Sequence, residues 1–214
     1  MRVAVIDPGS GNLASVRRAL ERAAHGTITV EITREADALL RADRIVLPGQ
    51  GAFAACRAGL DALDGMIPAL HEQVRIRKKP FLGICVGLQL LAERGLEHGI
   101  TPGLAWLSGE VAPMDPRASD GTPLPLPQMG WNTLDFTPGA HPVLNGLEPG
   151  DHAYFVHSFA WRGGAATDIL ATTDYGGSVP AILAHGNIIG TQFHVEKSAA
   201  IGLRILANFL RWQP

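Results

Sequence analysis

Short apolar runs alternate with amphipathic segments through the first part of the chain. Residues 2–6 and 44–47 are largely apolar, which is typical of strands covered on both faces. Residues 13–24 repeat apolar side chains at helical spacing, which predicts an amphipathic helix. The remaining predicted elements of this part are a strand over 27–32, a helix over 35–41, one or two helices between 53 and 77, and a strand and a helix on either side of Cys85. This alternation predicts an α/β fold with a doubly wound, mostly parallel sheet and flanking helices.

The second part of the chain has a different pattern. Proline and glycine are frequent from residue 95 to residue 150, and helical periodicity is weak there. We therefore expect an additional β-rich segment with long loops, and a closing amphipathic helix over 198–212. The strands predicted here cover residues 107–112, 124–129, 131–136, 154–161, 168–172, 181–184 and 188–193, with a tight turn at 185–187. With no internal repeat or linker, residues 1–214 are predicted to form one domain.

Composition narrows the class of protein. The formal net charge is −2, which gives no electrostatic reason to expect nucleic acid or an anionic membrane as a partner. No apolar run approaches the length of about 18 residues that a membrane span needs. Two cysteines and the lack of a signal-peptide pattern favour a reducing, cytoplasmic location.

Candidate chemistry begins at Cys85. Gly83 and Gly87 lie two residues before and two residues after it, which is the spacing of a nucleophile elbow with cysteine in place of serine. Small neighbours let a side chain stand clear of the sheet on a strained turn, and the N-terminus of the following helix favours a thiolate. The alternative is a buried strand cysteine that packs as a small hydrophobe.

A catalytic thiol needs a base, and eight histidines are available. His194 ends an apolar strand and precedes Glu196 by two residues. If this segment is extended, both side chains project to the same side, and the carboxylate can accept from one imidazole nitrogen while the other nitrogen faces the thiol. The alternative is a strand-end histidine beside a surface glutamate. The other histidines fall in or beside helices, in turns, or near the strand at 154–161.

These motifs together resemble the class I glutamine amidotransferase family, whose members carry a Cys-His-Glu triad. The matching segments are 83–89 for the nucleophile motif, 192–196 for the histidine-glutamate motif and 48–51 for the glycine-rich strand of the oxyanion hole. Further segments resemble the glutaminase subunits that supply a cyclase in histidine biosynthesis, namely 7–13, 48–53, 129–132, 154–159 and 197–198. The resemblance covers nearly the whole chain.

The resemblance implies a role for each of these positions. Cys85 would attack the side-chain amide of glutamine and form a γ-glutamyl thioester with release of ammonia, His194 would shuttle protons, and Glu196 would orient His194. No metal or organic cofactor is implied. The implied oxyanion and substrate-binding residues are Gly49, Gln50, Gly51, Val86, Gln89, Glu97, Ser158 and Phe159.

A partner is implied as well. It would be a cyclase subunit with a (β/α)8 barrel, forming a heterodimer in which ammonia travels by a dry route that prevents its protonation. Trp131, Asn132 and Lys197 would face this partner. The alternative for these three residues is a half-exposed packing aromatic with a solvated amide and a solvated lysine.

Two departures from the family pattern bear on activity. Val195 stands where proline is usual, and Gln50 stands where an apolar residue is usual. We expect the His194–Glu196 geometry to survive the first, and we expect the second to affect how readily the oxyanion loop reaches its active form. Three other functions stay open: a glutaminase subunit for another synthase, such as one for pyridoxal phosphate or sugar modification, a regulatory protein that lost turnover, and a cysteine hydrolase of related fold.

Overall fold

Seven strands form the central sheet of the computed structural model, which describes all residues from 1 to 214. Five neighbouring strands run parallel, and the last two at one edge are antiparallel hairpin strands. In spatial order the strands are β11 (Ile169–Asp174), β12 (Ser178–His185), β13 (Ile188–Thr191), β4 (Phe81–Cys85), β3 (Arg44–Gly49), β1 (Arg2–Ile6) and β2 (Thr29–Thr33). The predicted mostly parallel sheet is confirmed.

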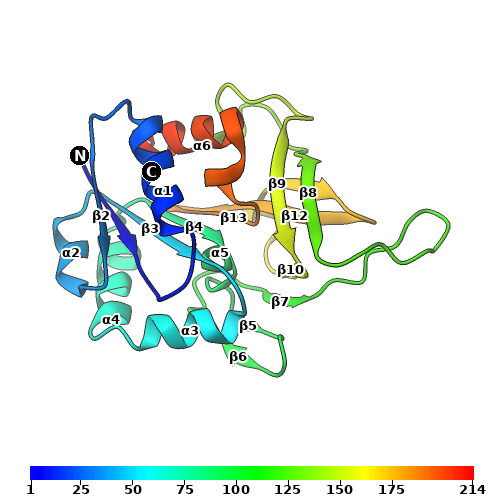
Figure 1. Ribbon diagram of the computed structural model, residues 1–214, viewed down its shortest axis with the longest axis horizontal. Helices are drawn as coiled ribbons and strands as arrows, with labels where there is room; N and C mark the ends of the chain where they lie inside the picture. The colour runs from blue at the N-terminus through cyan, green and yellow to red at the C-terminus, as the bar shows by residue number, and fades with distance from the viewer.

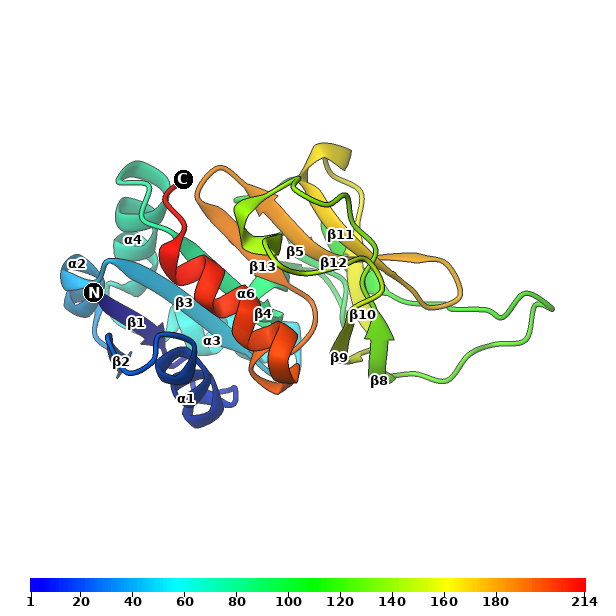
Figure 2. The same ribbon diagram turned by 90° about the horizontal axis from the view of Figure 1, so that it is seen from above.

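Helices cover both faces of this sheet (Figure 1). In Figure 2, α1 and α6 lie side by side across one face, while α3 and α4 lie behind the sheet. The α-helices are α1 (Leu13–Ala23), α2 (Ala36–Arg41), α3 (Phe53–Asp61), α4 (Met66–Leu70), α5 (Val86–Gln89) and α6 (Ala199–Arg211), and a π-helix, η1 (His71–Ile76), continues α4. None of the helices has the length and apolar character needed to cross a membrane.

The sequence pattern explains why these elements pack as they do. Strands β3, β4 and β13 are buried along their whole length, as expected for apolar strands covered on both faces. Helix α1 buries one stripe that includes Val16 and Leu20, and α6 buries Ile205 and Phe209 against the same face of the sheet. The core is therefore one continuous cluster on both sides of the central strands.

The β-rich part holds a four-stranded sheet of β10 (Phe159–Arg162), β7 (Glu110–Pro113), β5 (Arg94–Gly95) and β6 (Thr101–Pro102), and a two-stranded sheet of β8 (Gln128–Thr133) and β9 (His152–His157). In this part, β8 and β9 lie at the right of Figure 1, whereas β5 and β6 lie below α5 and beside α3. Three short 3₁₀ helices are η2 (Pro142–Leu144), η3 (Ala166–Asp168) and η4 (Val195–Lys197). The additional β-rich segment predicted from composition is confirmed.

Several predicted boundaries in this part were wrong. The two strands predicted over 124–129 and 131–136 are replaced by β8 alone, because prolines at 123, 125 and 127 cannot donate to a strand ladder. The strand predicted over 154–161 is divided at Ser158 into β9 and β10, which belong to different sheets. The strand predicted over 107–112 begins later, as β7.

Strand order places the candidate residues together. Strand β4 lies between β3 and β13, and all three run parallel. Gly49 at the end of β3 pairs with Cys85, and Thr191 at the end of β13 pairs with Ile84. Since parallel strands end at the same edge, the turn after β3, the elbow after β4 and the segment after β13 meet there.

Candidate active site

Cys85 occupies the tip of the turn between β4 and α5. Its backbone has φ 54° and ψ −112°, a conformation that L-residues rarely adopt and that costs about 1–3 kcal/mol. A Cβ atom at Gly87 would collide with the carbonyl of Leu47, and one at Gly83 would collide with the carbonyl of Gly87. The glycines of the motif are therefore required for the close approach of α5 to β3 and β4.

His194 and Glu196 lie next to this elbow. The imidazole Nδ1 is 2.9 Å from Glu196 Oε1, and both side chains are almost fully buried. The pairing was predicted, but the extended geometry was wrong, because Glu196 lies in the 3₁₀ helix η4. The hydroxyl of Ser198 donates to the His194 carbonyl at 2.8 Å and accepts from the Tyr154 N–H at 3.0 Å, which fixes this turn against β9.

The environment of His194 favours its protonated form. Burial disfavours the imidazolium, but hydrogen bonding and charge interactions with Cys85 and Glu196 outweigh that effect and raise the pKa of His194 to about 9. At neutral pH the site therefore holds an imidazolium beside the thiol. This group can stabilise a thiolate and can later give its proton to a leaving group.

A cavity of about 310 Å³ opens over Cys85. Its lining residues are Gln50, Gly51, Cys85, Val86, Gln89, Glu97, Pro127, Val156, His157, Ser158, Phe159 and His194. Nearly every residue predicted for catalysis or substrate binding is among them. The two exceptions are Gly49, which is held in the sheet beside Cys85, and Glu196, which lies behind His194.

Two glutamine side chains form a buried network beside the thiol. Gln89 Nε2 is 3.1 Å from Gln192 Oε1 and 3.1 Å from the Phe159 carbonyl. Gln192 Nε2 is directed at Cys85 Sγ from 3.9 Å. Gln89 was predicted as a site residue, whereas Gln192 was overlooked. The sequence offered one signal for Gln192, which is its position two residues before the candidate base His194.

His157 was considered only as a strand residue, yet it lines the cavity. Its Nδ1 donates to the Phe159 carbonyl at 2.9 Å, because a carbonyl can only accept. Burial lowers the pKa of His157 to about 4, and the charge of His194 adds to this effect. The site therefore contains one charged and one neutral imidazole at pH 7.

The other predicted substrate-binding residues are held by backbone contacts. The Glu97 carboxylate accepts from the Phe53 N–H at 2.7 Å, which connects the cavity wall to the start of α3. The Ser158 carbonyl accepts from the Met114 N–H at 3.0 Å. Glu97 remains the one carboxylate that lines the cavity, so it is the group there that can pair with a ligand cation.

Backbone donors flank the thiol on two sides. Val86 is the first residue of α5, so its N–H is not used by the hydrogen bonds of that helix. On the other side, the N–H groups of Gln50 and Gly51 form no hydrogen bond within the chain. Such donors can stabilise negative charge that develops on a substrate oxygen.

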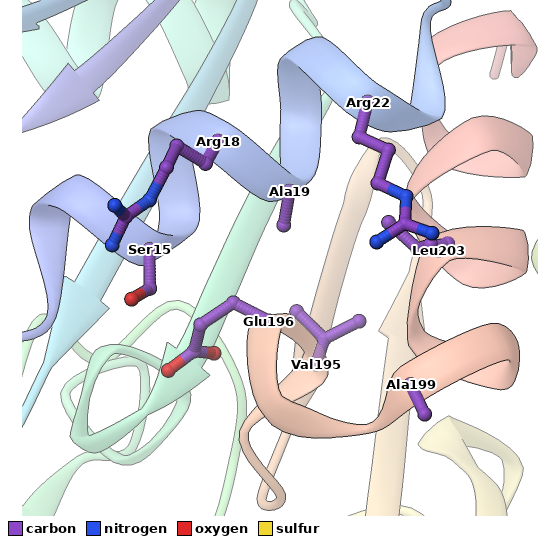
Figure 3. Close-up of a pocket in the computed structure, with 8 residues that line it drawn as sticks. All are labelled: Ser15, Arg18, Ala19, Arg22, Val195, Glu196, Ala199 and Leu203. Carbon is purple, nitrogen blue, oxygen red and sulfur yellow. The ribbon is translucent and has the colours of Figure 1, made fainter.

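A second cavity lies beside Glu196, between α1, η4 and α6 (Figure 3). It has a volume of about 310 Å³, and Arg18 and Arg22 flank it. Figure 3 shows the Glu196 carboxylate on the side of this cavity near Ser15. Glu196 therefore lies between His194 and the face formed by α1.

The residues predicted to face a partner differ in their surroundings. Trp131 is half exposed on β8 and packs edge-on against Tyr154, with ring centroids 5.9 Å apart. Lys197 is exposed and forms no ion pair within the chain. The amide of Asn132 instead donates to the Asp174 carbonyl at 2.7 Å and ties β8 to β11.

Solved structures share the fold. A crystal structure of a glutamine amidotransferase superposes with a TM-score of 0.72 at 20% identity, covering 97% of this chain and 96% of that chain. The glutaminase domain of Trypanosoma brucei CTPS superposes with a TM-score of 0.63 at 16% identity, covering 100% and 95% of the two chains.

Sequence relatives are much more similar. The imidazole glycerol phosphate synthase subunit HisH of Rhodospirillum rubrum is 54% identical over 220 residues and covers all of both chains. The protein of the same name from Granulibacter bethesdensis is 57% identical, covering 100% of this chain and 97% of its own. The family model described as glutamine amidotransferase class-I matches residues 4–212. The chain therefore belongs to the class I glutamine amidotransferase family.

Proposed function

We propose that this chain is the glutaminase subunit of an imidazole glycerol phosphate synthase, which hydrolyses glutamine and passes ammonia to a cyclase in histidine biosynthesis. The observation that carries the proposal is the strained Cys85 at the floor of a cavity, beside a buried His194–Glu196 pair. Relatives that are more than half identical over their whole length support the choice of synthase.

The chemistry follows from the positions of these groups. The Cys85 thiolate attacks the amide carbon of glutamine, and the oxyanion that forms is held by the Val86 N–H and by an N–H of the turn after β3. The His194 imidazolium gives its proton to the leaving nitrogen, and ammonia departs. His194 then takes a proton from the water that hydrolyses the γ-glutamyl thioester, and glutamate leaves.

Substrate specificity is assigned to the cavity walls. Glu97 pairs with the α-ammonium group of glutamine, and Gln89 keeps the Phe159 backbone in place for the substrate. The buried amide of Gln192 faces the sulfur and contributes a partial positive charge there. These assignments need no cofactor.

The partner in the proposal is a cyclase subunit with a (β/α)8 barrel, which forms a heterodimer with this chain. Met129 and Trp131 are exposed on the same face of β8, and such paired exposed hydrophobics are typical of interaction surfaces. We assign the contact to Trp131 and Lys197, and we give Asn132 the role of holding β8 in position. A thiol nucleophile has to remain reduced, so we place the protein in the cytoplasm.

The test uses the complex with its cyclase. Cys85→Ala should abolish glutamine-driven synthesis, while synthesis driven by added ammonium salt stays at the wild-type rate, because the cyclase site is untouched. Asp168→Asn, a change at the surface pair with His185 and away from the cavity, is the control and should keep the glutamine-driven synthesis. If the Cys85→Ala complex still uses glutamine, the proposed nucleophile is wrong.

A further inference from the structure

We propose that Cys56 is a positioning residue for the oxyanion turn, which its thiol anchors through the carbonyl of Gln50. The inference rests on the proposed glutaminase function. Cys56 lies on α3, is fully buried and does not line the catalytic cavity. Its part in the protein is therefore not explained by the reaction at Cys85.

Two hydrogen bonds meet at the Cys56 sulfur. Sγ is 3.2 Å from the Gln50 carbonyl oxygen, and it is 3.1 Å from Ser10 Oγ. A carbonyl can only accept, so the thiol donates its single proton to Gln50, and the Ser10 hydroxyl donates to the sulfur. Burial raises the pKa of the Cys56 thiol, which keeps this donor proton in place at neutral pH.

The position of Cys56 determines how the turn faces the cavity. Gln50 and Gly51 line the cavity, whereas Cys56 lies on the side of α3, so the turn separates the thiol from the catalytic site. A planar trans peptide directs its C=O and N–H in opposite directions. With the Gln50 carbonyl held on the α3 side, the N–H of Gly51 is directed towards the cavity.

Little else restrains this turn. Gln50 is exposed, and neither its N–H nor that of Gly51 is hydrogen-bonded within the chain. Gly51 has φ +91°, a backbone conformation that favours glycine. A Cβ atom placed there would have no neighbour within 4 Å, so lack of space is not the reason for glycine at this position. The thiol–carbonyl bond is therefore the contact that selects one orientation of the peptide from those that the turn can adopt.

Catalysis by backbone donors depends on such preorganisation, because a donor that has to reorient stabilises the oxyanion less. Loss of one hydrogen bond of ordinary strength lowers by about fivefold the population of the turn conformation that directs its N–H towards the cavity. We expect Cys56→Ala to lower kcat about fivefold and to leave KM for glutamine nearly unchanged, since the substrate-binding groups lie elsewhere in the cavity.

The experiment measures glutamate formation by the complex with its cyclase for the wild type, Cys56→Ala, Cys56→Ser and Ser10→Ala. Cys56→Ser keeps a donor and should recover most of kcat, and Ser10→Ala keeps the thiol–carbonyl bond and should stay near the wild type. Thermal unfolding of each variant identifies any loss that comes from misfolding, and kcat is compared at a temperature where all are folded.

The outcomes separate this proposal from the proposed function. An inactive wild-type complex would refute the glutaminase function itself. With an active wild type, the proposal on Cys56 is overturned by an alanine variant with unchanged or increased kcat, by an effect confined to KM, or by a serine variant as slow as the alanine variant.

Discussion

Replacing Glu196 with glutamine tests whether the buried carboxylate holds the catalytic imidazolium. Glutamine has nearly the same shape and can still accept from Nδ1, so the change removes the charge and keeps the contact at 2.9 Å. A hydrogen bond to a charged group contributes about 1.5–3 kcal/mol, and about 1.36 kcal/mol corresponds to one pKa unit. The pKa of His194, about 9 in the native protein, should therefore fall by roughly 1–2 units.

This shift has two kinetic consequences. The alkaline limb of kcat/KM, where the imidazolium loses its proton, should move from about pH 9 towards roughly pH 7–8. The rate at pH 7 should fall by no more than about twofold, because an imidazolium with a pKa of roughly 7–8 is still at least half protonated there, whereas the rate at pH 8.5 should fall by roughly threefold to 25-fold. The loss should be greater at pH 8.5 than at pH 6.5.

The assay follows glutamate by chromatography in the complex with its cyclase, from pH 6 to pH 10. Asp168→Asn is a matched control, because it removes the carboxylate of another histidine pair, His185–Asp168 at 3.0 Å, on the surface and away from the cavity. It should leave the profile unchanged. An alkaline limb that stays near pH 9 in Glu196→Gln, or one that moves equally in Asp168→Asn, would refute the assigned role of Glu196.

Three further changes have defined outcomes. The pKa of His157 is about 4 when folded and about 6.5 when unfolded, so the unfolded chain binds more protons between these values, and stability should fall by about 3 kcal/mol as pH drops through that window. Urea unfolding of His157→Gln at pH 4.5 and 7 should show a smaller difference than the wild type. Arg44→Ala removes hydrogen bonds to the carbonyls of Leu210 and Trp212 at the end of α6 and should lower stability by about 3 kcal/mol, measured as a drop in Tm. Val195→Pro should change turnover little and raise Tm slightly. The reason is that proline fits the first position of a 3₁₀ turn, which Val195 occupies, and it favours an extended preceding residue, which His194 is at φ −79° and ψ 95°. A large gain in turnover would show that valine compromises the native site.

The elbow could be predicted from sequence because its constraints are local. Gly83 and Gly87 are required by contacts within a few residues and by the adjacent strand, so their spacing around Cys85 carries the geometry. The parallel sheet was predictable for a similar reason, since its strands are apolar along their whole length.

The parts that sequence did not predict depend on distant contacts. The segment from His194 to Glu196 turns because Ser198 bridges it to Tyr154 on β9, and nothing in the local pattern indicates that bridge. Gln192 and His157 lie in segments whose pattern is that of buried strands. Only the pairing of β13 with β4 brings Gln192 beside Cys85, and only the end of β9 brings His157 to the cavity. The prolines before β8 are a loop signal that is visible in the sequence, and the predicted strand over 124–129 did not take them into account.

The site combines rigid and adjustable parts, and only the adjustable part can respond readily to a regulatory change at the surface. Cys85 ends β4 and His194 follows β13, and both strands are fully buried, so the core fixes the positions of the proposed nucleophile and base. The proposed oxyanion donors, in the turn after β3, are exposed and lie beside glycines, and the Gln50 carbonyl of this turn accepts from the thiol of Cys56. A change on the surface therefore alters the turn at much lower cost in free energy than it alters the triad. Regulation that acts there changes kcat more than KM, because it adjusts stabilisation of the oxyanion and leaves the binding of glutamine unchanged.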